Sequence, residues 1–207
     1  LRNRVGLVFQ YPEYQLFDET VRADIAFGPK NMNLSAEECD ARVARAAAFC
    51  GIDETVLSRS PFELSGGQKR RAAIAGVLAM DPEVLVLDEP AAGLDPRGRE
   101  EILGGLMEYQ KQRQSTMLII SHSMEDIAKY ADSILVLKNG KVFLFGTVGE
   151  VFADAQKLFD SSLDLPQITK LFVELQKRGL ADRTDVYTVG YAVKTAAKLA
   201  ENAAKEL

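Results

Sequence analysis

Two short apolar runs, separated by the length of one helix, constrain the fold of this chain most strongly. Val84–Leu87 and Met117–Ile120 are continuous apolar stretches, and Arg97–Gln112 between them has the pattern of a helix. Runs of this kind are typical of strands that are buried on both faces of a parallel sheet. A strand, a helix and a second strand in that order predict an α/β fold with a mainly parallel sheet.

Local signals predict further elements before this unit. Arg4–Gln10 has the pattern of a short buried strand, and a loop around Pro12 should follow it. One helix is expected over Thr20–Phe27, with Gly28-Pro29 as its end, and a second from a capping box at Ser35 to about Cys50. A short helix over Glu54–Ser58 and a longer one from Ser65 to Met80 should follow.

The carboxyl-terminal part should begin with a hairpin and continue as helices. Ser133–Leu137 and Lys141–Phe145 flank Asn139-Gly140, which is a strong hairpin signal. A capping box at Thr147 opens the helical part, and an apolar stripe follows at Ile168, Leu171, Phe172 and Leu175. That stripe needs a cover, which is either its own domain or a second subunit.

The composition argues against two classes of protein. The 207 residues include 25 Lys or Arg and 30 Asp or Glu, a net charge of -5, without the basic surplus of a nucleic-acid-binding protein. No apolar run approaches the roughly 18 residues that span a bilayer, and no segment has the pattern of a secretory leader. A role at a membrane would therefore go through a partner.

Two adjacent acids follow the first apolar run. Asp88 and Glu89 come directly after Val84–Leu87, and the carboxyl ends of parallel strands form the edge where α/β proteins bind ligands. Asp88 could hold a magnesium ion through its water shell, and Glu89 could orient and polarise an attacking water. Taken alone, the pair is also compatible with a plain helix cap.

A glycine-rich segment precedes the Ala-rich helix. Its residues would bring the backbone close to a ligand and aim free N–H groups at it: Ser65, Gly66, Gly67 and Gln68. Lys69-Arg70-Arg71 then places three cations in the first turn, where the helix dipole favours acids. A bound anion would remove this conflict. The alternative is a simple turn before a buried helix, with its cations in solvent.

Gln10 and His122 are further candidates at strand ends. Gln10 closes the first predicted strand, and its amide could contact a metal ion or water. His122 is the single histidine and follows the second apolar run, so we expect it at the same sheet edge as Asp88. A single histidine is also common in a purely structural role.

Together these segments resemble the ATP-binding-cassette (ABC) ATPases, and the resemblance covers most of the chain. The family's motifs have counterparts in the family's order: Phe9-Gln10 resembles the Q-loop, Leu64–Gln68 the signature motif, Val84–Pro90 the Walker B strand, Ala92–Asp95 the D-loop and Ser121-His122 the switch region. The resemblance implies ATP and Mg²⁺ as cofactors and ATP hydrolysis as the reaction.

The resemblance also implies a role for each candidate residue. Asp88 and Gln10 would bind the magnesium ion, Glu89 would be the catalytic base, and His122 would contact the γ-phosphate. ATP sites of this family form between two chains, so the remaining candidates would contact nucleotide in part from the partner's side: Ser65, Gly66, Gly67, Gln68 and Asp95.

Within the family, the segments Phe9–Phe17 and Asp24–Pro29 resemble the energy-coupling factor ATPases, and Gly28–Asn31 and Lys69-Arg70-Arg71 are closer to the second of their two paralogues. Those subunits drive the uptake of vitamins or of cobalt or nickel ions. The resemblance implies a peripheral protein at the cytoplasmic face of the membrane. Its partners would be a second ATPase subunit, a transmembrane coupling subunit and a substrate-binding membrane subunit, with no nucleic acid.

The resemblance divides the chain into a nucleotide-binding domain at 1–146, with a helical subdomain at about 20–80, and a helical dimerisation tail at 147–207. The P-loop motif Gly-x-x-x-x-Gly-Lys-Ser/Thr, which the family places before the Q-loop, occurs nowhere in the sequence. We therefore expect a truncated member that is inactive alone, with one flank of Val84–Leu87 unpaired. The alternatives are a soluble ABC ATPase that acts on DNA or ribosomes and a non-catalytic fragment that pairs with a complete subunit.

Overall fold

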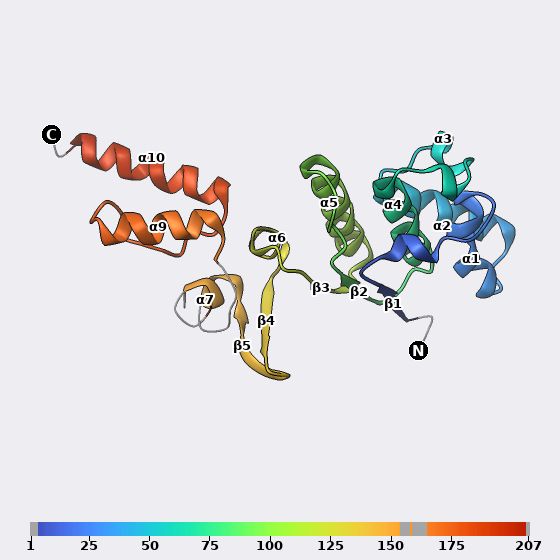
Figure 1. Cartoon of the computed structure of the whole chain (residues 1–207), viewed down its shortest axis with the longest axis horizontal. Helices are drawn as coiled ribbons and strands as arrows, with labels where there is room; N and C mark the ends of the chain where they lie inside the picture. The colour runs from blue at the N-terminus through green and yellow to red at the C-terminus, as the bar shows by residue number, and fades with distance from the viewer. Residues whose placement is uncertain (1–3, 154–157, 159–164, 206–207) are drawn as a thin grey trace. The chain divides into compact units, whose positions relative to one another are not determined.

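The chain folds into two compact units, Leu1–Ser121 and His122–Leu207 (Figure 1). The structure is a computed structural model that describes residues 4–153, 158 and 165–205. The β4–β5 hairpin of residues 133–147 lies in the second unit, together with the helices that follow it. The division into functional domains at 146/147 stays a prediction.

The first unit is built on a parallel sheet of the three predicted strands. Strands β1 (Val5–Val8), β2 (Val84–Asp88) and β3 (Thr116–Ile120) run in that order, with β2 in the middle. The predicted parallel α/β architecture is therefore confirmed. The expectation that one flank of β2 is unpaired is wrong, because β1 and β3 occupy both of its edges.

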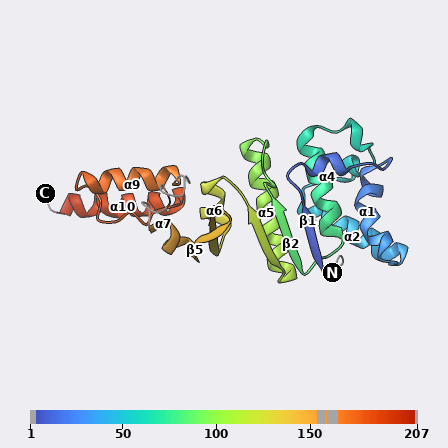
Figure 2. The same cartoon turned by 60° about the horizontal axis from the view of Figure 1, so that its bottom comes forward.

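Helices α4 (Gly66–Ala79) and α5 (Pro96–Arg113) connect these strands and cover one face of the sheet (Figure 2). Both crossovers step in the same direction along the sheet, and right-handed connections of that kind place their helices on the same side. Gly6 lies on the covered face, where an added Cβ would come within 2.8 Å of Val77 Cγ1 in α4.

The opposite face of the sheet is open within this unit. Leu7, Leu118 and Ile120 lie on it, and Leu118 and Ile120 are 51% and 48% exposed. The prediction that β2 and β3 are buried on both faces is therefore wrong for the first unit as described. The reason is the common direction of the two crossovers, which leaves the second face without α4 or α5.

The helical subdomain follows β1 and supplies a second layer around α4. It consists of η1 (Pro12–Gln15), α1 (Val21–Asn31), α2 (Ala36–Phe49), α3 (Glu54–Leu57) and η2 (Pro61–Glu63). The residues around Pro12 thus form a 3₁₀ helix rather than the expected loop.

Helix α1 continues past Gly28-Pro29, where the sequence predicted its end. An added Cβ on Gly28 would lie 2.5 Å from Met80 Cγ, at the end of α4. This glycine therefore allows two helices to approach closely instead of ending one of them. Pro29 is buried inside the last turn of α1, and because proline has no N–H group, the carbonyl of Ile25 lacks its usual helical donor there.

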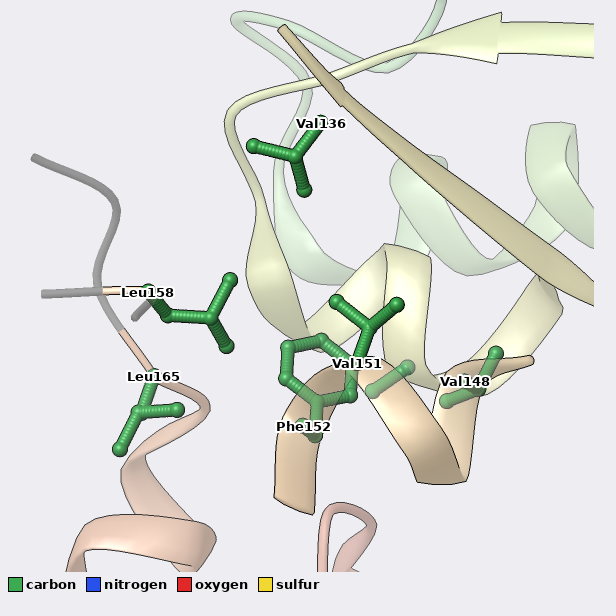
Figure 3. Packing of buried hydrophobic residues seen from close by; sticks show 7 residues of the cluster. Val136, Val148, Val151, Phe152, Leu158 and Leu165 are labelled. Atoms are coloured by element: carbon green, nitrogen blue, oxygen red, sulfur yellow. The ribbon is translucent and has the colours of Figure 1, made fainter. Parts of the chain in front are cut away.

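The second unit contains α6 (Met124–Tyr130) and the predicted hairpin of β4 (Ser133–Lys138) and β5 (Lys141–Thr147). Asn139 and Gly140 both have positive φ, 52° and 73°, as a type I′ turn requires. Helix α7 (Val148–Ala153) follows, with the predicted capping box between Thr147 and Glu150. Figure 3 shows the buried cluster that holds these elements together, including Val136, Val151, Phe152, Leu158 and Leu165.

Helices α9 (Gln167–Lys177) and α10 (Val189–Lys205) form the tail. Phe172 is buried in a cluster with Val186 and Ala192, and Ile168 and Leu175 pack against it, so most of the predicted stripe is covered within the tail. Leu171 is half exposed. Among the described residues, no helix is both long and apolar enough to cross a membrane.

Candidate functional site

Three of the predicted site residues come to the carboxyl-terminal edge of the parallel sheet. Asp88 is the last residue of β2, and Glu89 follows it directly. Val8, the last residue of β1, pairs with Leu87, which brings the segment with Gln10 beside the end of β2. The structure therefore places an amide and two carboxylates at the ligand-binding edge of an α/β sheet.

The backbone of Glu89 adopts a conformation that is rare for a residue with a side chain. Its φ is +50°, a left-handed value at which Cβ crowds the following carbonyl oxygen. Glu89 N donates to Ile120 O at 2.9 Å, and Glu89 O accepts from Ala92 N at 3.1 Å. Both bonds fix the turn after β2, and strained residues of this kind are concentrated at functional sites.

The signature segment forms the N-terminus of α4 as a complete capping box. Ser65 Oγ accepts from Gln68 N at 3.3 Å, and Gln68 Oε1 accepts from Ser65 N at 3.1 Å. A Cβ added to Gly66 would meet nothing within 4 Å, so the protein itself does not require a glycine there. The free N–H groups of this helix end and the open space over Gly66 suit an anion brought from outside.

The signature segment and the D-loop lie against each other. A Cβ added to Gly67 would lie 3.2 Å from Leu94 Cδ2, and Ser65, Gly67, Leu94 and Asp95 line one hollow. Asp95 caps α5 by accepting from the N–H groups of Arg97 and Gly98 at 3.0 Å each. The bond from Gly98 is the main reason that the pKa of Asp95 is lowered. Its predicted contact with nucleotide stays a prediction.

Two of the three cations after the signature segment bind acids of the protein. Arg70 pairs with Glu13, at 3.2 Å from Nε to Oε2, and Arg71 pairs with Glu101, at 2.7 Å from Nη2 to Oε2. The hydrogen bond from Arg71 is the main reason that the pKa of Glu101 is lowered. Internal carboxylates therefore relieve part of the conflict of these two arginines with the helix dipole, and the alternative with all three cations in solvent is wrong for the buried Arg70. An anion at this helix end stays a prediction.

These acids are what the sequence analysis missed. Glu13 lies 57 residues before Arg70, and Glu101 lies 30 residues after Arg71. Opposite charge is the only signal in the sequence that links the two pairs, and many other pairings share it.

His122 opens the second unit, two residues after Ile120 ends β3. It is followed by Ser123, whose side chain caps α6 by accepting from Asp126 N at 3.2 Å. The role of His122 as a γ-phosphate contact stays a prediction.

Comparisons with known proteins agree with this arrangement. A family profile described as ABC transporter matches residues 1–92. The energy-coupling factor transporter ATP-binding protein EcfA2 of Clostridium tetani is 52% identical over 205 residues, which cover 99% of this chain and 71% of that protein. The EcfA2 of Caldanaerobacter subterraneus is 54% identical over 189 residues, which cover 91% of this chain and 66% of that protein.

Solved structures show the same fold. CbiO1 from Clostridium perfringens, described as part of the ABC transporter complex cbiONQ, superposes with a TM-score of 0.69 and 42% identity, over 86% of this chain and 66% of that one. The ATP-binding cassette MJ0796, a dimer bound to ADP and phosphate, gives a TM-score of 0.62 and 26% identity, over 71% and 64%.

The fold and the similarity to these proteins thus define an ABC transporter ATPase, and the chain belongs to that family. Within the family it is of the energy-coupling factor type, as the sequence predicted. The comparisons do not favour the alternative of an ABC ATPase that acts on DNA or ribosomes.

Proposed function

We propose that this chain belongs to an ATP-hydrolysing subunit, and that this subunit powers an energy-coupling factor type uptake transporter for vitamins or for cobalt or nickel ions. The observation that carries the proposal is that Asp88 and Glu89 end β2 beside the segment that carries Gln10 after β1, in a chain about half identical to EcfA2 proteins. Asp88 would bind the metal ion, and Glu89 would orient the attacking water and accept its proton.

The residues at this edge suit Mg²⁺. The carboxylate of Asp88 and the amide oxygen of Gln10 are the hard oxygen donors that this ion prefers. In the part of the chain that the structure describes, no three His, Cys, Asp or Glu side chains gather as a metal site. Mg²⁺ needs few protein ligands, because it keeps several waters and binds substrate phosphates. When bound, it would neutralise charge that develops on the phosphates.

The signature segment supports a site shared between two subunits. Its helix end points N–H groups at open space over Gly66, which fits a phosphate group held by a partner. A second ATPase subunit is therefore part of the proposal. So are a transmembrane coupling subunit and a substrate-binding membrane subunit, which would hold the ATPase pair at the cytoplasmic face of the membrane.

The test is Glu89→Gln in the complete gene product, assembled with its partners. We expect ATP binding to remain and turnover to fall by about 10² to 10⁴, because glutamine keeps the shape and removes the base. Asp88→Asn should weaken the dependence on Mg²⁺, which a titration with Mg²⁺ measures. Hydrolysis by Glu89→Gln at the rate of the unaltered protein would show that Glu89 is not the base.

A further inference from the structure

One buried cation holds three segments of the site together. Arg70 lies one turn into α4 and is 4% exposed. Its Nε and Nη2 atoms bond the carboxylate of Glu13 at 3.2 and 3.3 Å, and Nη2 also donates to Gln10 O at 3.1 Å. Its Nη1 donates to the carbonyl oxygen of Ala92.

The partners of Arg70 lie on both sides of the proposed catalytic edge. Gln10 carries the amide proposed for the metal ion, and Arg70 holds the backbone of that same residue. Ala92 ends the turn that begins at Glu89, because Ala92 N donates to Glu89 O. One guanidinium therefore bonds both the segment of the proposed metal ligand and the turn of the proposed base.

Only arginine has the donors for this arrangement. The guanidinium presents five N–H groups in a rigid planar fork, which can bind a carboxylate with two atoms and reach separate carbonyl groups with others. A lysine ammonium keeps the charge, but its three donors radiate from one nitrogen. It can pair with Glu13 and cannot hold both carbonyl groups in the same geometry.

We infer that Arg70 is a positioning residue for ATP hydrolysis, which sets Gln10 relative to Glu89 through their backbones. The inference rests on the proposed function, because it needs hydrolysis to occur at this sheet edge. Arg70 contacts neither metal nor nucleotide in this role. It acts by holding two chain segments whose small displacements change the rate of ATP hydrolysis. A misplacement of about 1 Å can lower such a rate by about 10²-fold.

The experiment measures kcat and KM for ATP of Arg70→Lys in the complete gene product, assembled with its partners. We expect kcat to fall at least about tenfold, with KM and nucleotide affinity within about threefold, because the loss concerns positioning rather than binding. Arg42→Lys is the matched control. Arg42 also binds a carboxylate and a carbonyl, Glu38 at 3.0 Å and Met80 O at 3.2 Å, away from the sheet edge. Its kcat should not change.

A double-mutant cycle with Gln10→Ala separates positioning from a general loss of structure. If Arg70 acts through Gln10, then Arg70→Lys lowers kcat much less in the Gln10→Ala background than in the parent. If Arg70→Lys lowers kcat by the same factor in the parent and in Gln10→Ala, the inference is overturned. A kcat of Arg70→Lys within twofold of the parent value would also overturn it.

Two further measurements keep the result interpretable. If Arg70→Lys does not fold, Arg70→Gln combined with Glu13→Gln removes the buried charge pair together, and the same cycle is measured on that variant. The unaltered protein and Glu89→Gln are run beside it. Equal hydrolysis by those two proteins contradicts the proposed function, whereas additivity in the Gln10 cycle contradicts only the role of Arg70.

Discussion

The left-handed backbone of Glu89 makes a stability prediction that is independent of the reaction. Its φ of +50° is a value that only glycine adopts without steric cost. We compare Glu89→Gly with Glu89→Ala in the complete gene product. Both variants remove the carboxylate and all of its contacts, so the difference between them reports the Cβ atom and the backbone alone.

The expected difference follows from opposing effects. A Cβ at left-handed φ costs about 1–2 kcal/mol, whereas glycine gives the unfolded chain extra freedom that favours alanine by about 0.4–1 kcal/mol. Glu89→Gly should therefore be the more stable variant by about 1 kcal/mol. The exposed helical residue Glu108 in α5 is the control site. There the order should reverse, with alanine more stable by about 0.8–1 kcal/mol.

The assay is urea unfolding without nucleotide, followed by circular dichroism, with midpoints compared at equal slope. Neither Glu89 variant should hydrolyse ATP, so the stabilised glycine variant would still be inactive, as expected where a strained site serves function. Two results would refute the left-handed backbone conformation of Glu89 and the strain argued from it. One is equal free energies of unfolding for Glu89→Gly and Glu89→Ala, and the other is a more stable alanine variant, as at Glu108.

Two more predictions test packing and assembly. Gly104→Ala should raise the free energy of unfolding by about 0.5–1 kcal/mol, because the added Cβ would meet nothing within 4 Å. Gly105→Ala should lower the free energy of unfolding by about 1–3 kcal/mol, because the added Cβ would lie 1.8 Å from Phe49 O. Urea unfolding of both variants checks the two predictions. Deleting residues 165–207 should weaken dimers in light scattering and leave nucleotide binding intact. An unchanged dimer would show that the tail does not hold two subunits together.

Local chemistry explains which parts of the fold were predictable. The capping box at Thr147 and the Asn139-Gly140 turn depend on residues within four positions of each other, and both form as predicted. The strands β2 and β3 carry continuous apolar runs separated by one helix, which made their existence and parallel pairing predictable. Their exposed second face was not predictable in this way, because the direction of the crossovers is a property of the whole sheet.

The parts that the sequence did not reveal are contacts between distant segments. Gly28 looked like a helix end because its contact with Met80 is invisible in the sequence. Arg70 looked like an anion-binding cation because Glu13 lies 57 residues away. The strain at Glu89 has no sequence signal either, since nothing about a glutamate after a strand implies positive φ. All three depend on tertiary packing, which overrides local preference.

Helix α4 links the proposed partner contact to the proposed catalytic edge. Its N-terminus carries Ser65 and Gly66, which would bind nucleotide on the second subunit, and Arg70 lies four residues further along, about 6 Å of helix rise. If this end of α4 moves when it binds nucleotide on the proposed partner, the bonds from Arg70 to Gln10 and Ala92 would have to move with it or break. Such a movement would connect nucleotide binding on the second subunit to the positions of the proposed metal ligand and base. We therefore expect Arg70→Lys to weaken cooperativity between the two ATP sites as well as kcat.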